Sequence, residues 1–171
     1  MRLFVGLDLP EPVQSALFAS MGGVAGARWQ SAAQLHLTLR FIGEVDRHSA
    51  ADIAAALGRV NIRPFTAELG EPGLFEHRGR IDALWVGVRP AEALAGLAKA
   101  INTALASVGI APEPRAFVPH ITIARGRTMI GATGWPQSPI RRVAWPVNGF
   151  ALFESRMGKD GSDYAMLARW P

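Results

Sequence analysis

The sequence of 171 residues contains no cysteine. This absence excludes disulfides, thiolate zinc sites, iron–sulfur clusters and cysteine nucleophiles, and it agrees with a reducing compartment. The sequence also lacks an uninterrupted run of about 18 apolar residues, the length that a membrane-spanning helix needs. The short apolar run near the N-terminus is broken by Asp8 and does not resemble a secretory signal. We therefore expect a soluble, cytoplasmic protein.

Motifs of several common enzyme classes are missing as well. There is no G-x-x-x-x-G-K-[ST] segment, and the glycines at 22, 23 and 26 do not follow a predicted strand, so nucleoside triphosphates have no phosphate-binding loop. There is no G-x-S-x-G segment either, which argues against the common serine hydrolases.

Lysine is scarce, and the positive charge consists almost wholly of arginine. Of the 18 Lys and Arg residues only Lys99 and Lys159 are lysines, and the formal net charge is +4. Between Glu113 and Glu154 the chain has five arginines and no acidic residue. The planar guanidinium group suits phosphate, so this stretch predicts a positive surface for a polyanion such as RNA. For the arginine bias alone, a GC-rich genome is the simpler explanation.

The composition fits one globular domain, which we expect to span residues 1–171, since 49% of the residues are apolar and 19% are charged. β-Prone and alternating runs predict strands at 3–7, 35–41, 64–69, 83–88, 120–124, 147–153 and 164–170. Helical spacing predicts helices from 11 to the glycines at 22 and 23, at 46–57, and at 94–108 with a glycine cap at 109. Residues 70–80 and 126–142 are expected to be loops, and 158–161 a turn between the last two strands.

Two patterns occur twice in the same order. Phe4-Val5-Gly6-Leu7 corresponds to Trp85-Val86-Gly87-Val88, 81 positions later, and each precedes a proline and a helix. His36-Leu37-Thr38-Leu39 corresponds to His120-Ile121-Thr122-Ile123, 84 positions later. The offsets are each close to half of the chain, so we expect an internal duplication that forms two similar β-α-β halves facing each other.

The second pattern, His-x-Thr-x with apolar x, carries the candidate chemistry. Because side chains alternate between the faces of a strand, His36 and Thr38 share one face, as do His120 and Thr122. An imidazole with a pKa of about 6.5 exchanges protons near neutral pH, so two of them form an acid–base pair for displacement at phosphorus. The hydroxyl groups are suited to binding the non-bridging phosphate oxygens.

The surroundings of the two histidines favour a phosphate site without a metal. Arg40 and Arg125 follow the histidines at positions +4 and +5. Neither histidine has an Asp or Glu within three positions, whereas a di-metal phosphoesterase needs such ligands close by. His48 and His77 are expected on the surface. We therefore expect no metal and no cofactor.

At this point the sequence resembles a known family. The segments HLTLRFIGE (36–44) and PHITIAR (119–125) resemble the paired motifs of the two-histidine (2H) phosphoesterases. The most similar branch is the bacterial and archaeal RNA 2′,3′-cyclic phosphodiesterases, also called 2′-5′ RNA ligases. The flanking segments 2–10, 152–156 and 164–168 resemble the first and the last two strands of that family, so the resemblance covers nearly the whole chain.

The resemblance implies an α+β fold of two lobes with pseudo-twofold symmetry, in which antiparallel sheets line a central cleft and helices lie outside. It implies opening of a 2′,3′-cyclic phosphate at an RNA 3′ end without a metal, which leaves a 2′-phosphate. His36 would donate a proton to the departing 3′ oxygen and His120 would activate water. The residues that would bind the substrate are Thr38, Thr122, Arg40 and Arg125.

Several alternatives remain open from the sequence. The same site supports the reverse reaction, 2′-5′ joining of RNA ends, because forward and reverse reactions share a transition state. Cleavage of 2′-5′ oligonucleotides or of a small cyclic nucleotide is a related possibility. A non-catalytic RNA-binding module is a different class, against which the intact His and Thr pairs argue. We expect RNA as the partner, no membrane partner and a monomer.

Overall fold

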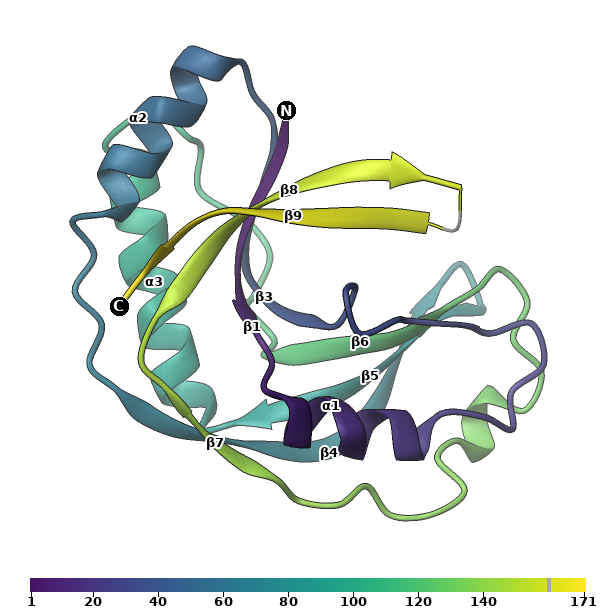
Figure 1. The fold of residues 1–171 in the computed structure, drawn as a ribbon. Helices are drawn as coiled ribbons and strands as arrows, with labels where there is room; N and C mark the ends of the chain where they lie inside the picture. The colour runs from purple at the N-terminus through teal and green to yellow at the C-terminus, as the bar shows by residue number, and fades with distance from the viewer. Residues whose placement is uncertain (160) are drawn as a thin grey trace.

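The computed structural model describes residues 1–159 and 161–171 (Figure 1). Its helices are α1 (Glu11–Ser20), α2 (Arg47–Leu57) and α3 (Ala91–Ala106), with a short 3-10 turn, η1 (Ala132–Gly134). Its strands are β1 (Arg2–Asp8), β2 (Arg28–Trp29), β3 (His36–Glu44), β4 (Phe65–His77), β5 (Arg80–Arg89), β6 (His120–Arg125), β7 (Ala144–Val147), β8 (Phe150–Gly158) and β9 (Gly161–Trp170).

The strands form one curled antiparallel sheet in the order β7-β4-β5-β6-β3-β1-β8-β9, with β2 beside β6 (Figure 1). β6 and β3 meet in the middle, where Leu37 pairs with Ile121. Outward from this seam, β5 and β4 on one side correspond to β1 and β8 on the other. Helix α1 follows β1 as α3 follows β5. This arrangement confirms the predicted α+β fold built from two duplicated halves.

The alternation within the two central strands separates core from site. The apolar positions of both motifs are buried, with Leu37 and Ile121 fully inaccessible to solvent. They belong to one large apolar cluster with the buried residues of the three helices, and α3 packs against β3 and β5. The histidines and threonines of the motifs therefore lie on the opposite face of the sheet, which we call the open face.

Local signals account for the ends of the predicted helices. The Asp46 carboxylate accepts a hydrogen bond of 2.8 Å from the backbone N–H of Ser49 and caps α2. After α3, Gly109 adopts a φ of 84°, and the N–H of Ile110 donates to the carbonyl of Leu105 at 3.1 Å. A glycine tolerates this left-handed conformation without a steric cost. The cap predicted at 109 is therefore confirmed.

Two of the predicted boundaries are wrong. Residues 70–77 are not a loop, because β4 continues to His77 and pairs with β5 through a tight turn at Arg78 and Gly79. The register shifts between Leu69 and Pro72, which lets a strand rich in glycine and proline keep its pairing.

The strand predicted at 147–153 is two strands, since β7 pairs with β4 and β8 with β1. The turn between β8 and β9 lies where expected, but its residue 160 is outside the described residues.

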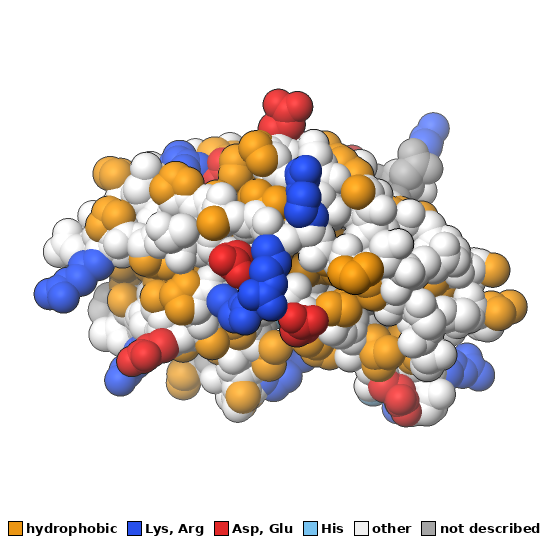
Figure 2. Space-filling model, turned by 90° about the horizontal axis from the view of Figure 1, so that it is seen from below, with side chains coloured by type: hydrophobic (Ala, Val, Ile, Leu, Met, Phe, Trp, Pro, Cys, Tyr) orange, Lys and Arg blue, Asp and Glu red, His pale blue; other side chains and the backbone are white. Residues whose placement is uncertain are grey.

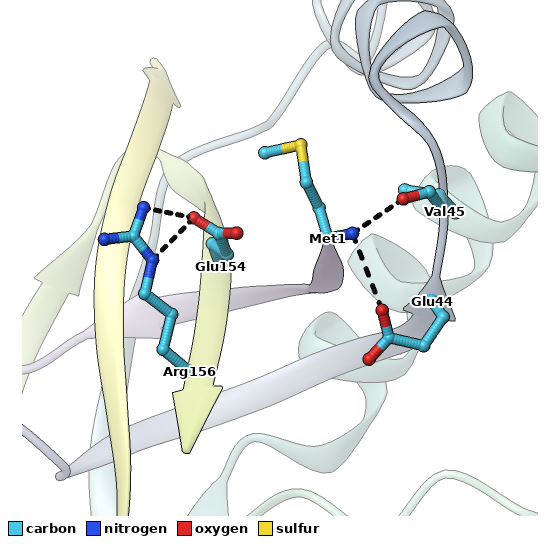
Figure 3. A network of polar contacts seen from close by, with 5 residues as sticks. All are labelled: Met1, Glu44, Val45, Glu154 and Arg156. Carbon is cyan, nitrogen blue, oxygen red and sulfur yellow. Dashed lines mark hydrogen bonds and ion pairs between the residues drawn. The ribbon is translucent and has the colours of Figure 1, made fainter. Parts of the chain in front are cut away.

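The first strand is held at its start by the terminal amine, as Figure 3 shows. The amine of Met1 donates to the carbonyl of Val45 at 2.8 Å and lies 3.5 Å from the Glu44 carboxylate. On β8, Arg156 and Glu154 form an ion pair of 2.6 Å (Figure 3). The contacts of the amine fix the start of β1 at the end of β3, and β1 supplies a wall of the site described below.

Candidate active site

The structure brings His36 and His120 together on the open face. The antiparallel pairing of Leu37 with Ile121 places His36 opposite Thr122 and Thr38 opposite His120, so the two histidines lie diagonally across the seam from each other. All four side chains are half-buried. One imidazole and one hydroxyl from each half of the chain therefore border the same small area.

Both imidazoles are anchored in the same way. Nδ1 of His36 lies 2.8 Å from the carbonyl oxygen of Gln34, and Nδ1 of His120 lies 2.6 Å from that of Val118. A carbonyl only accepts hydrogen bonds, so Nδ1 carries the proton in each ring. Nε2 is then the basic nitrogen, and in His36 it accepts from the Thr38 hydroxyl at 3.0 Å. Each imidazole is thus held in the tautomer that carries its proton on Nδ1 and leaves Nε2 unprotonated.

The pKa of each imidazole lies below its usual value. Burial lowers the pKa of His36 to about 4, the Gln34 carbonyl opposes this shift, and the positive charges of Arg125 and His120 add to it. Burial also lowers the pKa of His120, against the effect of the Val118 carbonyl, and Arg125 lowers it further. Both rings are therefore neutral at pH 7 in the absence of an anion.

Aromatic rings surround His36 on the open face. Its ring centroid lies 4.7 Å from that of Phe4 and 4.8 Å from that of Tyr164, which meets it edge-on at 77°. Phe153 stacks on Phe4 at 5.0 Å. Phe4 and Phe153 form a small apolar cluster with Ala151, separate from the main core. This cluster covers one side of the imidazole and contributes to the burial that lowers its pKa.

The second half repeats this arrangement around His120. Phe75 on β4 meets His120 edge-on at 4.9 Å, and Trp85 on β5 lies 5.8 Å from it and 5.3 Å from Phe75. Trp85 therefore corresponds to Phe4, as the repeated pattern of aromatic, valine and glycine had indicated. In the sequence this pattern indicated only a duplication, although it also marked the walls of the site.

Three glycines lie beside these rings, and one of them makes room for a ring. A Cβ on Gly6 would lie 3.5 Å from the Phe4 ring and 2.7 Å from the carbonyl oxygen of Leu37. A Cβ on Gly87 would lie 3.6 Å from the Trp85 ring, and one on Gly73 would collide with that ring. Gly73 thus leaves room for the Trp85 ring beside His120, whereas a Cβ at Gly6 or Gly87 would meet the ring at an ordinary van der Waals distance.

We expect Gly73→Ala to move Trp85 away from His120. The added methyl group overpacks a filled space, which costs about 1–3 kcal/mol of the free energy of unfolding. The measurements are urea unfolding and the NMR signals of the His120 ring, which lies against Trp85. Gly96→Ala is the control, because a Cβ there meets nothing within 4 Å inside α3, and we expect a gain of about 0.5–1 kcal/mol. Unchanged His120 signals in Gly73→Ala would contradict the role of this glycine.

Arg125 lies on the open face because β6 contains a bulge. Thr122 pairs with Trp85 while Ala124 pairs with Leu84, so one extra residue of β6 is inserted between them. Ala124 is buried, and the exposed Arg125 follows on the face of His120 and Thr122. Its charge acts on both histidines. The structure therefore brings Arg125 together with the four motif side chains.

Arg40 does not face the site, so the structure does not bring this predicted ligand residue to the histidines. β3 has the same bulge, so Arg40 corresponds to Ala124 and Phe41 corresponds to Arg125. Only 6% of Arg40 is exposed. Its guanidinium donates to the carbonyl of Ala111 and lies 3.6 Å from the Glu113 carboxylate. Arg40 is thus a buried link between β3 and the segment after α3.

Nearby carboxylates offset part of the positive charge of the arginine-rich stretch of residues 114–153. Arg142 lies 3.6 Å from the carboxylates of both Glu68 and Glu71, and Arg115 lies 3.3 Å from that of Glu113. Figure 2 shows acidic side chains directly beside basic ones on the face seen from below. Of the five arginines, Arg125 is the one that the structure places beside the histidines.

The remaining histidines lie away from the site, and they form no metal centre. Within residues 1–159 and 161–171, no three His, Cys, Asp or Glu side chains are grouped so that they could hold a metal ion. His48 is exposed and pairs with Asp52 at 3.7 Å, and His77 is exposed at the end of β4, as predicted.

Among the helices in residues 1–159 and 161–171, none has the length and hydrophobicity needed to cross a membrane.

Comparison with known sequences identifies the family. The family model of the 2′-5′ RNA ligase superfamily matches residues 12–158. A protein of Thermus thermophilus named RNA 2′,3′-cyclic phosphodiesterase is 33% identical over 184 residues, which cover 99% of this chain and 89% of the relative. A protein of Escherichia coli with the same name is 31% identical over 173 residues, which cover 99% of this chain and 95% of the relative.

Solved structures agree with this result. The crystal structure of TT0787 of Thermus thermophilus superimposes with a TM-score of 0.82 at 29% identity, covering 99% of this chain and 97% of that one. The crystal structure of E. coli LigT complexed with 3′-AMP gives a TM-score of 0.80 at 28% identity, covering 99% and 96%. The resemblance of the paired motifs is confirmed, and the chain belongs to the 2′-5′ RNA ligase superfamily.

Proposed function

We propose that this protein hydrolyses the 2′,3′-cyclic phosphate at RNA 3′ ends to a 2′-phosphomonoester. The observation that carries the proposal is the pair of imidazoles on neighbouring strands, each with Nδ1 bound to a carbonyl and Nε2 as its basic nitrogen. The names of the relatives from T. thermophilus and E. coli support the same reaction. RNA is accordingly the substrate class.

The geometry supports different roles for the two histidines, one as the general base and the other as the general acid. His120 accepts a proton from water as its oxygen bonds to phosphorus, and His36 donates a proton to the 3′ oxygen as the P–O3′ bond breaks. Thr38 and Thr122 donate hydrogen bonds to the non-bridging oxygens. Arg125 stabilises the negative charge that develops on them. After product release, His120 loses its extra proton to solvent and His36 takes up a proton from solvent.

The bound phosphate sets the protonation state that this reaction needs. Without substrate, burial and the Arg125 charge keep the pKa of both histidines low. A phosphate anion between the rings offsets the Arg125 charge and favours an imidazolium at one of them. In the proposed mechanism His36 then carries the second proton on Nε2 and directs it at the leaving oxygen, while the Thr38 hydroxyl, which bonds to Nε2 in the free protein, turns to the phosphate.

The site needs both halves of the chain, because each half supplies one histidine and one threonine. We therefore propose residues 1–171 as one functional domain that acts as a monomer. We propose the cytoplasm as its location, because the absence of cysteine agrees with that compartment.

Product analysis tests the proposed reaction directly. An oligoribonucleotide ending in a 2′,3′-cyclic phosphate is incubated with the protein, and the product is analysed by mass and by regiospecific digestion. We expect a gain of one water and a 2′-phosphate, with full activity in EDTA because no step uses a metal. An exclusive 3′-phosphate product, or EDTA inhibition reversed by a divalent ion, would contradict the mechanism.

The same experiment separates hydrolysis from ligation. Ligation uses a 5′-hydroxyl in place of water as the nucleophile and joins two ends through a 2′-5′ linkage. Addition of an RNA with a 5′-hydroxyl supplies that nucleophile. We expect hydrolysis to exceed joining, because water reaches the half-buried histidines without a second bound strand. Joined product in excess of hydrolysed product would assign the protein to ligation.

A further inference from the structure

A second arginine lies on the open face beside Arg125. Strand β2 pairs antiparallel with β6, with Arg28 opposite Arg125 and Trp29 opposite Ala124. Directly paired residues of antiparallel strands project to the same face. Trp29 belongs to the core side, where it lies 6.5 Å from Trp135. Arg28 therefore projects to the face of Arg125 and the histidines.

This pairing is unfavourable without an anion. Like charges directly opposite each other in a sheet are destabilising, and both arginines are exposed. In the part of the chain that the structure describes, no ion pair involves Arg28 or Arg125. Arg125 is accounted for by the reacting phosphate in the proposed function, but Arg28 is not.

Arg28 also lies next to the segment that leads into His36. Its Nε is 3.9 Å from the place that a Cβ of Gly161 would occupy, and the Gln34 side-chain nitrogen is 3.2 Å from the same place. Gln34 donates to the carbonyl of Ser162 at 3.1 Å, and its own carbonyl holds His36. Arg28 is thus set where β2, β9 and the start of β3 meet, beside the reaction centre.

We propose that Arg28 binds the phosphodiester on the 5′ side of the terminal nucleotide, while Arg125 faces the cyclic phosphate. The inference rests on the proposed function and deepens it by naming a residue that distinguishes an RNA end from a mononucleotide. An RNA end carries a second anion one nucleotide away from the reacting one, whereas a free nucleoside 2′,3′-cyclic phosphate does not. A guanidinium group binds such a phosphate through paired N–H donors. The protein therefore selects oligonucleotide ends over mononucleotides.

Three substrates test the assignment: adenosine 2′,3′-cyclic phosphate, its 5′-phosphorylated form, and the dinucleotide ApA ending in a 2′,3′-cyclic phosphate. A hydrogen bond to a charged group corresponds to roughly tenfold or more in binding. We therefore expect kcat/KM to be about tenfold higher for the two substrates with a second phosphate. Arg28→Met should remove most of this preference by raising KM, and Arg28→Lys should retain part of it.

Salt dependence gives a second readout. A cation that contacts a single strand contributes about 0.7 to the slope of log(kcat/KM) against log[salt]. We expect the slope for ApA 2′,3′-cyclic phosphate to fall by about that amount in Arg28→Met. The control is Arg59→Met, which removes an equal charge from an exposed arginine beside the groove between α2 and α3, and should change neither the preference nor the slope.

The outcomes separate the inference from the function on which it rests. Equal kcat/KM for all three substrates, or an equal loss on all three in Arg28→Met, overturns the phosphate contact and leaves the hydrolysis intact. A loss in Arg59→Met as large as that in Arg28→Met also overturns it, because the effect would then follow net charge. No turnover of any substrate by the unaltered protein overturns both proposals.

Discussion

Replacement of either His36 or His120 by asparagine is expected to lower kcat for the cyclic phosphate by about 10²- to 10⁴-fold, the usual contribution of a general acid or base. Asparagine keeps an N–H group that can reach the carbonyl of Gln34 or Val118, so the strands remain anchored. It has no group that takes up or releases a proton near neutral pH. The measurement is single-turnover hydrolysis of an RNA 2′,3′-cyclic phosphate, with the free energy of unfolding measured alongside.

The double variant distinguishes a shared step from two independent effects. If both imidazoles act in one transition state, His36→Asn combined with His120→Asn should be little slower than the worse single variant, because residues that act as a unit are not additive. His48→Asn is the matched control, since the His48 side chain is 91% exposed on α2. More than a tenth of normal activity in either single variant would eliminate the acid–base pair.

The placement of the histidines and threonines was predictable because it depends on local alternation. In β3 and β6 the polar residues at positions 36, 38, 120 and 122 alternate with buried apolar ones, so a two-residue period is sufficient to assign their face. The internal duplication predicted that the two motifs lie side by side, because the equivalent strands of the two similar halves meet at the seam. This part of the site needed no knowledge of distant contacts.

Arg40 shows where alternation fails. Counted from His36 with a strict period of two, Arg40 belongs to the site face, yet it is buried on the other side. The cause is a bulge that depends on pairing with β1, where the register shifts between Val5 and Gly6. A bulge arises between two strands, so one strand's sequence does not reveal it. The same device brings Arg125, at an odd offset from His120, onto the open face.

The aromatic walls could not be assigned from local pattern for a similar reason. Phe75 lies in a segment with Gly70, Pro72 and Gly73, a composition typical of loops. Pairing with β5 and the Trp85 ring that covers Gly73 keep this segment extended. Tertiary contacts here override local preference. The repeated aromatic, valine and glycine pattern was the available signal, and its meaning required the three-dimensional position of His36 and His120.

Arg125→Met is expected to lower kcat/KM for the cyclic phosphate by about 10²-fold or more, as the loss of one group that stabilises transition-state charge does in other enzymes. Methionine retains much of the side-chain volume and removes the charge. Arg125→Lys should recover part of the loss. Arg127→Met, two residues further along in the loop, is the control for net charge and should remain close to the unaltered protein.

The pH dependence of the same variant tests the electrostatic role separately from binding. In the free protein the pKa of His36 is about 4 and that of His120 is also below 6.5, and kcat/KM reports the free protein. The profile should therefore be a bell centred on the acidic side of pH 6.5. Arg125 disfavours both imidazolium ions, so its removal raises both pKa values and moves the bell towards neutral pH. NMR titration of the two rings should show the same upward shifts. A bell that stays in place while kcat/KM falls would mean that Arg125 binds phosphate without acting on the histidines, and the acidic profile would then result from burial alone.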